Sequence, residues 1–135
     1  MKTAKTTLLI IILSGIFLSA ECQKIPSDAK IKSLIVTEEK SDMLIKKQFK
    51  DSETYYDSKG NVLESITYKQ GKIDKHFKYQ YDSDNNKIKE EEFDPSGKIK
   101  ETSVYKYSNG LRSEKIVYDA SDKVKTKKTY TYTTY

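Results

Sequence analysis

Apolar and polar residues alternate along most of the chain, and short turn-forming segments interrupt the alternation at regular intervals. In residues 72–81, Phe77, Tyr79 and Tyr81 fall on one face, together with Ile73, and charged or polar residues fall on the other. A period of two is typical of a β-strand with one face partly buried. The same pattern predicts six strands, at residues 62–68, 72–81, 87–93, 98–107, 111–118 and 123–132.

Two more strands are predicted upstream, at residues 30–38 and 43–50, on either side of residues 39–42. The alternation of Lys30, Ile31 and Lys32 favours a strand, whereas residues 43–45 could also begin a short helix. Residues 23–29, which include Pro26, are predicted to form a flexible lead-in.

The segments between the later strands are short and consist of residues that favour turns. They are residues 57–60, 69–71, 82–86, 94–97, 108–110 and 119–122. Glycine and asparagine accept positive φ, and aspartate bonds to nearby backbone amides, so each segment predicts a tight reversal. Short reversals join antiparallel neighbours. We therefore expect an all-β fold, an antiparallel meander of hairpin repeats forming a single twisted or curled sheet of about eight strands.

Aromatic residues recur at a nearly constant spacing through this region. They are Tyr56, Tyr68, Tyr81, Phe93, Tyr107, Tyr118 and Tyr132. Successive members lie 11 to 14 residues apart, every second one recurs after 25 or 26, and aspartate follows four of the seven. A fixed period of this length indicates a repeated supersecondary unit. The repeat covers residues 52–132 within a domain that spans residues 30–135.

The glycine and tyrosine spacing resembles the tyrosine-aspartate (YD, Rhs-type) repeat. Gly71 precedes Tyr79-Gln80-Tyr81-Asp82, and Gly97 precedes Tyr105-Lys106-Tyr107-Ser108, where the aspartate is missing. The chain is also similar to MORN-type proteins, which stack short hairpins with a tyrosine and a glycine in each unit. The resemblance to YD repeats implies an array that acts as a scaffold, shell or binding surface at the bacterial exterior, and it implies no catalytic residues.

The N-terminus has the features of a secretory signal peptide. Lys2 and Lys5 precede an apolar run over residues 8–18, which is too short to span a bilayer as a helix. We expect residues 1–22 to direct export to the periplasm or the cell exterior. A short N-terminal anchor is the alternative.

Because of Cys22, the sequence is compatible with more than one signal-peptide cleavage site. Residues 18–22 are similar to a bacterial lipoprotein signal, in which the cysteine is lipidated, but Glu21 stands where that motif has a small residue. The alternatives are ordinary cleavage after Ala20 or after Cys22. A membrane contact is expected only through this lipid anchor. Cys22 is the single cysteine, so a disulfide within the monomer is excluded.

Charge argues against nucleic acid as a partner. The formal net charge is +5, acidic and basic residues are intermingled, and Arg112 is the only arginine. Nucleic-acid binding usually needs clustered lysine and arginine. The basic stretch over residues 123–128 is better explained as an edge strand that discourages pairing with other sheets.

No catalytic or metal-binding set can be assembled from these residues. His76 is expected to lie exposed on the charged face of its strand. Residues 82–86 have polar residues at the spacing of the first three ligands of a calcium-binding loop. The glycine and the final glutamate that such a loop needs are missing, so a turn is the better interpretation. Glu90, Glu91 and Glu92 form an acidic run without a predicted cleft. We expect no cofactor and no metal.

Three classes of function remain. The first is an exported, non-enzymatic repeat protein of the bacterial cell envelope that acts as a scaffold binding a protein or a polymer. The second is a glycan-binding module that uses a ligand-facing strip of tyrosines. Its members are Tyr79, Tyr81, Tyr105, Tyr107, Tyr130 and Tyr132. An enzyme using sheet carboxylates is a third and weaker hypothesis. The partner itself, an envelope protein or polysaccharide, is not specified by the sequence.

Overall fold

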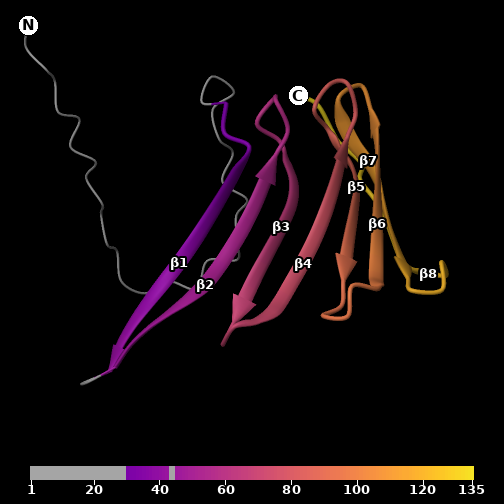
Figure 1. Cartoon of the computed structure of the whole chain (residues 1–135). Coiled ribbons are helices and arrows are strands. Elements are labelled where there is room, and N and C mark those ends of the chain that lie inside the picture. Colours follow the sequence, from indigo (N-terminus) through magenta and orange to yellow (C-terminus); the bar gives the residue numbers. More distant parts are fainter. Residues whose placement is uncertain (1–29, 43–44) are drawn as a thin grey trace, which may run out of the picture.

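The computed structural model describes residues 30–42 and 45–135, and Figure 1 shows them as eight strands. The strands are β1 (Ser33–Asp42), β2 (Ile45–Tyr56), β3 (Val62–Lys69), β4 (Lys72–Tyr81), β5 (Lys87–Phe93), β6 (Ile99–Ser108), β7 (Leu111–Asp119) and β8 (Val124–Thr129). The predicted signal peptide, Cys22 and the lead-in over residues 23–29 lie outside the described residues.

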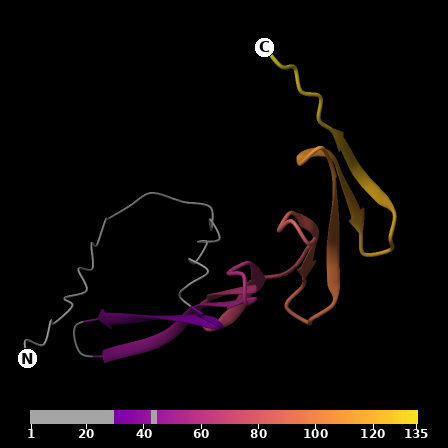
Figure 2. The same ribbon diagram turned by 90° about the horizontal axis from the view of Figure 1, so that it is seen from above.

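All eight strands belong to one sheet, in the order β1 to β8, and each is antiparallel to the next. The predicted all-β meander is therefore confirmed. Seen from above, the sheet is strongly twisted and open, with β1 and β8 at opposite ends (Figure 2). Among residues 30–42 and 45–135, no helix is long and apolar enough to cross a membrane.

Strand boundaries agree best in the centre of the sheet and least at its edges. β4 and β5 have the predicted limits, whereas β1 extends to Asp42 and β8 already ends at Thr129. The prediction that the second strand ends at residue 50 is wrong, since β2 continues to Tyr56. Val36 pairs with Ser52 and Thr37 with Lys50, so Asp51 is an extra residue in a β-bulge. The polar segment around Asp51 is thus accommodated inside a strand.

Six of the seven recurring aromatic residues lie beside a β-bulge near the end of their strand, whereas Tyr132 lies beyond β8. The register shifts directly before Tyr56, Tyr68, Tyr81, Phe93, Tyr107 and Tyr118. In every case the extra residue belongs to the following strand, for example Asp74, which lies between the partners of Thr67 and Tyr68. Bulges increase the local right-handed twist. Six of them, alternating between the two ends of the sheet, account for the strong twist in Figure 2.

The recurring aromatic residues divide between the two faces of the sheet. Residues directly opposite in a ladder share a face, as do residues two apart on one strand. By this rule the strand pairings place Tyr56, Tyr81 and Tyr107 on one face, here called face A. Tyr68, Phe93 and Tyr118 lie on the opposite face, called face B. The 25-residue period is the distance along the chain between successive aromatic residues on one face.

Aspartate after the aromatic residue produces one kind of loop. In the loop after β2, Asp57 Oδ1 accepts hydrogen bonds from the amides of Lys59 and Asn61, both at 2.8 Å. Asp82, Asp94 and Asp119 accept the same two backbone bonds in their own loops. The fourth residue of each loop has positive φ, and it is Gly60, Asn85, Gly97 or Asp122.

The two loops without this aspartate are shorter. Lys69 follows Tyr68, and Ser108 follows Tyr107. Here β3 connects to β4 through Gln70-Gly71, and β6 connects to β7 through Asn109-Gly110, with positive φ at all four residues. Two successive residues of positive φ define the type I′ turn that suits a two-residue hairpin. The residue after each aromatic therefore decides the loop type.

Replacing Asp57 with alanine is expected to lower the free energy of unfolding by about 1 to 2 kcal/mol, because two loop amides and the Asn61 side chain lose their acceptor. Asn61 also donates from Nδ2 to Asn85 Oδ1 at 3.0 Å, which links the loops after β2 and β4. Urea unfolding followed by circular dichroism measures the change. Ser58→Ala, in the same loop, is the matched control, and an equal effect of both substitutions would contradict this role for Asp57.

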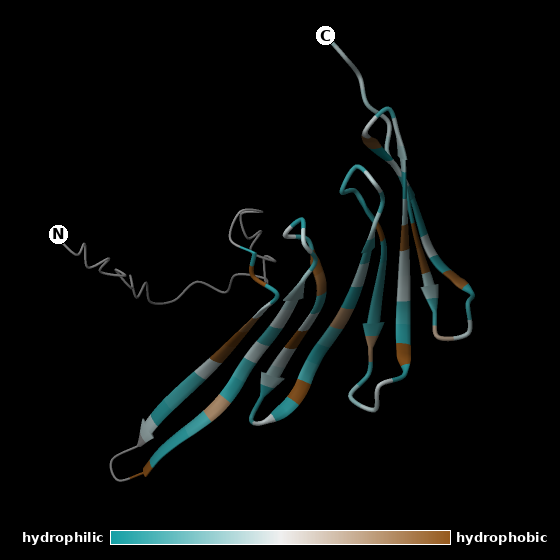
Figure 3. Ribbon diagram, turned by 45° about the horizontal axis from the view of Figure 1, so that its top comes forward, coloured by the Kyte–Doolittle hydropathy of each residue, from teal (hydrophilic) through white to brown (hydrophobic). Residues whose placement is uncertain are grey.

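The sheet has little core in the usual sense. The buried hydrophobic residues are Tyr56, Val62, Tyr105 and Val117, and no large side chain of the described residues is fully buried. Short hydrophobic bands alternate with hydrophilic ones along most strands (Figure 3). Ion pairs between strands add stability where the side chains are hydrophilic. Examples are Lys106 with Glu114, at 2.9 Å, and Lys125 with Glu101, at 2.7 Å.

Candidate functional site: tyrosines and cations on face A

The tyrosine strip predicted from the sequence is interleaved with cationic side chains. The pairings place Tyr79 and Tyr81 of β4 on the same face as Tyr105 and Tyr107 of β6. Lys87 of β5 lies between these strands, and its Nζ is 5.0 Å from the Tyr79 ring centroid and 5.2 Å from that of Tyr105. The rings on β4 and β6 are thus joined through a cation above the intervening strand.

Arg112 makes a similar link further along the sheet. Its Cζ lies 4.7 Å from the ring centroid of Tyr105, 5.9 Å from that of Tyr107 and 6.0 Å from that of Tyr130. Tyr132 donates a hydrogen bond from its hydroxyl to the Arg112 carbonyl at 2.8 Å. The structure therefore brings Tyr105, Tyr107 and Tyr130 together around the single arginine of the chain.

Tyr105 is at the centre of this cluster and is only 6% exposed. A third cation, Lys115 Nζ, lies 5.3 Å from its ring centroid. Burial, together with the nearby negative charge of Glu90, raises the pKa of Tyr105 to about 12. Glu90 accepts a hydrogen bond from the Tyr105 hydroxyl at 3.4 Å and pairs with Lys87. These contacts make Tyr105 a packing residue, with little of its ring left for a ligand.

The accessible part of the strip is at the C-terminal end. Tyr132 is 51% exposed, and Tyr130 is half-buried beside it. The two rings line a shallow hollow of about 220 Å³ together with Ser108, Asn109 and Ser113. Tyr107 is anchored instead, since its hydroxyl donates to the Lys87 carbonyl at 2.9 Å. An open aromatic surface with hydroxyl and amide groups beside it suits a polar ring-shaped ligand.

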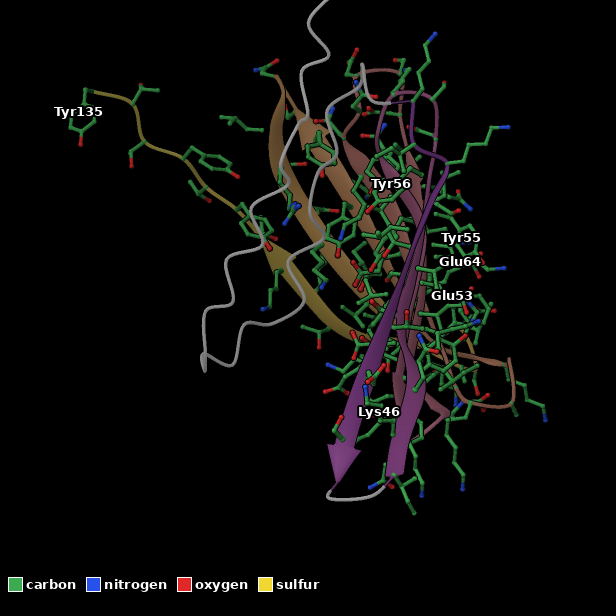
Figure 4. All side chains as sticks on the ribbon, turned by 60° about the vertical axis from the view of Figure 1, so that its left-hand side comes forward. Lys46, Glu53, Tyr55, Tyr56, Glu64 and Tyr135 are labelled. Atoms are coloured by element: carbon green, nitrogen blue, oxygen red, sulfur yellow. The ribbon has the colours of Figure 1, made fainter. Side chains whose placement is uncertain are left out.

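Face B carries a cluster around one nearly buried carboxylate, which the alternation along the chain does not predict. Glu53 on β2 is 8% exposed, and it accepts hydrogen bonds from Lys50 Nζ at 2.8 Å, from the Tyr55 hydroxyl at 2.7 Å and from the Tyr68 hydroxyl. These bonds, that from Lys50 first, lower the pKa of Glu53 to about 2, and the bond to Glu53 raises the pKa of Tyr68 to about 12. Figure 4 shows Glu53 near Tyr55 and Glu64.

The expectation that His76 is exposed is wrong. Its side chain is 15% exposed, its Nε2 lies 2.6 Å from Glu64 Oε1, and its ring stacks on Phe93 with 4.7 Å between centroids. The bulge at Asp74 explains part of the error, because Ile73 pairs with Tyr68 and so shares face B with His76. The strand has no single charged face. The contacts of His76 with Glu64 and Phe93 fix its position in the sheet.

The acidic segments that raised the question of a metal have structural roles. Asp82 Oδ1 accepts from the amides of Asp84 and Asn86, and Oδ2 accepts from Asn86 Nδ2, so the turn interpretation is confirmed. These bonds, that from the Asn86 side chain first, lower the pKa of Asp82. The described part of the chain contains no group of three or more histidine, cysteine, aspartate or glutamate residues that could hold a metal ion.

Comparisons with known proteins add no family to this description. No protein-family model matches the chain, and a search of curated proteins finds no significant match. The class of protein is therefore defined by the fold alone, an open antiparallel meander built on a 25-residue hairpin unit.

Proposed function

We propose that the protein is an exported, non-enzymatic repeat protein of the bacterial cell envelope that acts as a scaffold binding a protein or a polymer. The observation that carries the proposal is the single-layer sheet, in which no described large side chain is fully buried and both faces remain open to a partner. The resemblance to YD repeats, and less closely to MORN-type repeats, supports the same role. The open single layer supports a binding role over catalysis, since catalytic sites usually lie in clefts or cavities.

Export is the part of the proposal that rests on the N-terminal sequence. The basic residues and the apolar run over residues 8–18 support a signal peptide, and the choice between a lipid anchor at Cys22 and soluble export stays open. Mass spectrometry of the mature N-terminus distinguishes these outcomes. A lipid on Cys22 indicates an anchored protein, a start at Glu21 or Gln23 indicates a soluble one, and an intact Met1 in the cytoplasm contradicts export.

Partner binding can be tested by chemical cross-linking of the folded protein to an extract of its own cell envelope. We expect cross-links from lysines of the sheet to one envelope protein or polymer. The same cross-linking after thermal unfolding is the control, because an array that binds through its sheet loses its surface on unfolding. Equal cross-linking before and after unfolding would contradict a scaffold role.

A second candidate is a glycan-binding module, and the hollow beside Tyr130 and Tyr132 favours it. Sugars stack on accessible aromatic rings, and Tyr132 is the most exposed member of the predicted strip. Its hydroxyl is hydrogen-bonded to the Arg112 carbonyl, which holds the ring against the sheet. The cations on face A add a preference for acidic sugars. Tyr105 contributes by holding the cluster together, since its own ring is covered by Lys87, Arg112 and Lys115.

Replacing Tyr132 with alanine is expected to weaken glycan binding by about tenfold or more, because an aromatic anchor of the hollow is lost. Tyr135→Ala is the matched control, since Tyr135 is fully exposed and extends away from the sheet (Figure 4). Binding is measured on a glycan array and by titration with the best ligand found there. No glycan bound by the wild-type protein, or equal loss in both variants, would exclude this candidate.

A further inference from the structure

The two edges of the sheet differ in chemistry. β8 carries Lys125, Lys127 and Lys128 in six residues, and all six residues are exposed. β1 instead contains an uncharged apolar segment, in which Leu34 is 42%, Ile35 is 54% and Val36 is 39% exposed. This segment forms a hydrophobic band on the outermost strand in Figure 3. An apolar edge strand is a template for pairing with another strand, whereas a lysine-rich edge opposes pairing.

The backbone of β1 has hydrogen-bonding groups directed away from the sheet. Tyr56 donates from its amide to the Lys32 carbonyl at 2.9 Å, so the peptide groups of Lys32 face β2. Backbone groups alternate in direction along an antiparallel ladder. The amide and carbonyl of Ser33 and Ile35 therefore point outward, where a further strand can bind them.

Residues 32–38 can pair in an antiparallel direction with the same residues of a second copy. With Ile35 opposite Ile35 of a second antiparallel copy, Leu34 lies opposite Val36 of that copy. Lys32 then lies opposite Glu38, and the two-fold symmetry produces this ion pair twice. Shifting the pairing by two residues to place Val36 opposite Val36 brings Lys32 opposite Lys40, which is repulsive. In the register centred on Ile35, Lys30 would fall opposite Lys40, but Lys30 precedes β1 and has a positive φ of 46°, so the chain is not extended there. Centring the pairing on Leu34 places Lys32 opposite Val36 and Ser33 opposite Ile35, which pairs polar with apolar residues. Over residues 32–38, the register centred on Ile35 is therefore the one that matches both the apolar and the charged residues.

We propose that the protein forms a two-fold symmetric dimer through antiparallel pairing of β1 with β1 of a second copy, centred on Ile35, to give a continuous sheet of both chains. Glu38 lies 3.3 Å from Lys40 of its own strand, and both side chains are well exposed, so Glu38 is accessible to Lys32 of the other copy. The lysine-rich β8 edge stops further growth, so the assembly closes as a dimer. This dimer does not depend on what the faces of the sheet bind.

The first test is the association state of the full protein by sedimentation velocity over a range of concentrations. We expect a dimer with a dissociation constant on the order of micromolar, because strand pairing buries a small area. Ile35→Lys places two like charges at the centre of the interface and is expected to raise the dissociation constant by about tenfold or more. Val124→Lys is the matched control on the other edge, where Val124 is 60% exposed, and it is expected to change nothing.

Charge exchange tests the register. Lys32→Glu and Glu38→Lys each replace two attractive pairs with two repulsive ones, so each is expected to weaken the dimer by about tenfold. The double variant restores both pairs with reversed polarity and is expected to return the dissociation constant to within about threefold of the wild type. Circular dichroism of each variant checks that the monomer remains folded.

Three results would overturn the proposal. The first is a wild-type protein that stays monomeric up to a concentration of about 100 µM, far above the expected dissociation constant. The second is a dimer that Ile35→Lys and the charge reversals leave intact. The third is an open-ended assembly that Val124→Lys abolishes, which would indicate pairing of β1 with β8.

Discussion

Replacing Tyr105 with alanine is expected to lower the free energy of unfolding by about 2 to 4 kcal/mol and the melting temperature by roughly 10 °C. Among the residues that the structure describes, Tyr105 is one of four buried hydrophobic residues, and it lies under three cations from β5 and β7. Truncation leaves Lys87, Arg112 and Lys115 without their shared ring. The expected loss is below that for an enclosed core because water reaches both faces of the sheet. Thermal and urea unfolding measure it.

Two further variants separate the contributions to this effect. Tyr105→Phe keeps the ring and the cation contacts and loses the hydroxyl with its bonds to Glu90, at 3.4 Å, and Ser103, so it is expected to retain most of the stability. Tyr135→Ala removes a fully exposed ring and is expected to have no effect. A Tyr105→Ala protein as stable as the wild type would show that the face A cluster does not hold β4 to β7 together.

Replacing Glu53 with glutamine is expected to remove part of the dependence of stability on acid pH. The folded pKa of Glu53, about 2, lies below its ordinary value of 4.5, so its ionised form stabilises the fold. That stabilisation is fully present above about pH 4.5 and is lost as the pH falls towards 2. After allowance for solvent screening in a single-layer sheet, it is on the order of 1 to 2 kcal/mol.

The measurement is the free energy of unfolding from pH 2 to pH 6 for the wild type and for Glu53→Gln. The wild type should lose more stability across this range than the variant, and the difference isolates Glu53 from the other acids. Glu39→Gln is the matched control, since Glu39 is exposed and lies 3.3 Å from Lys46. Parallel pH profiles for the wild type and Glu53→Gln would contradict the role of the Glu53 cluster.

The sequence predicted the central strands and every loop after β2 because each of those features has a local cause. β4 and β5 are bounded by glycine, asparagine or aspartate on both sides, and the loop aspartates bond within their own loops. The sequence pattern predicts too early an end for β2 because Asp51 resembles a strand end. A bulge that depends on pairing with β1 carries the strand through it.

The sites were harder to predict because they depend on cross-strand register. Each bulge changes the face of the residues that follow it, so alternation along the sequence no longer indicates a constant face, as Ile73 and His76 illustrate. The contacts of Lys87 and Arg112 with the tyrosines join residues of different strands. The one sequence feature that points to this cluster is that Arg112 is the single arginine of the chain.

The assignment of residues to faces explains the period of the aromatic repeat. A 25-residue unit places one aromatic residue on each face, beside a bulge, so the repeat builds two surfaces of different chemistry. Face A combines tyrosines with cations around Tyr105, and face B combines Glu53, His76 and Phe93. If the proposed scaffold role holds, the two faces offer different chemistry to different partners.

The most direct test of the scaffold proposal is lysine labelling of the protein in its own intact cell envelope, compared with the purified protein. If the sheet binds an envelope partner, lysines that share one face should be protected from the reagent in the envelope and reactive after purification. Candidates on face A include Lys87 and Lys115, and those on face B include Lys78 and Lys106. Identical labelling of every lysine in both settings would contradict the account.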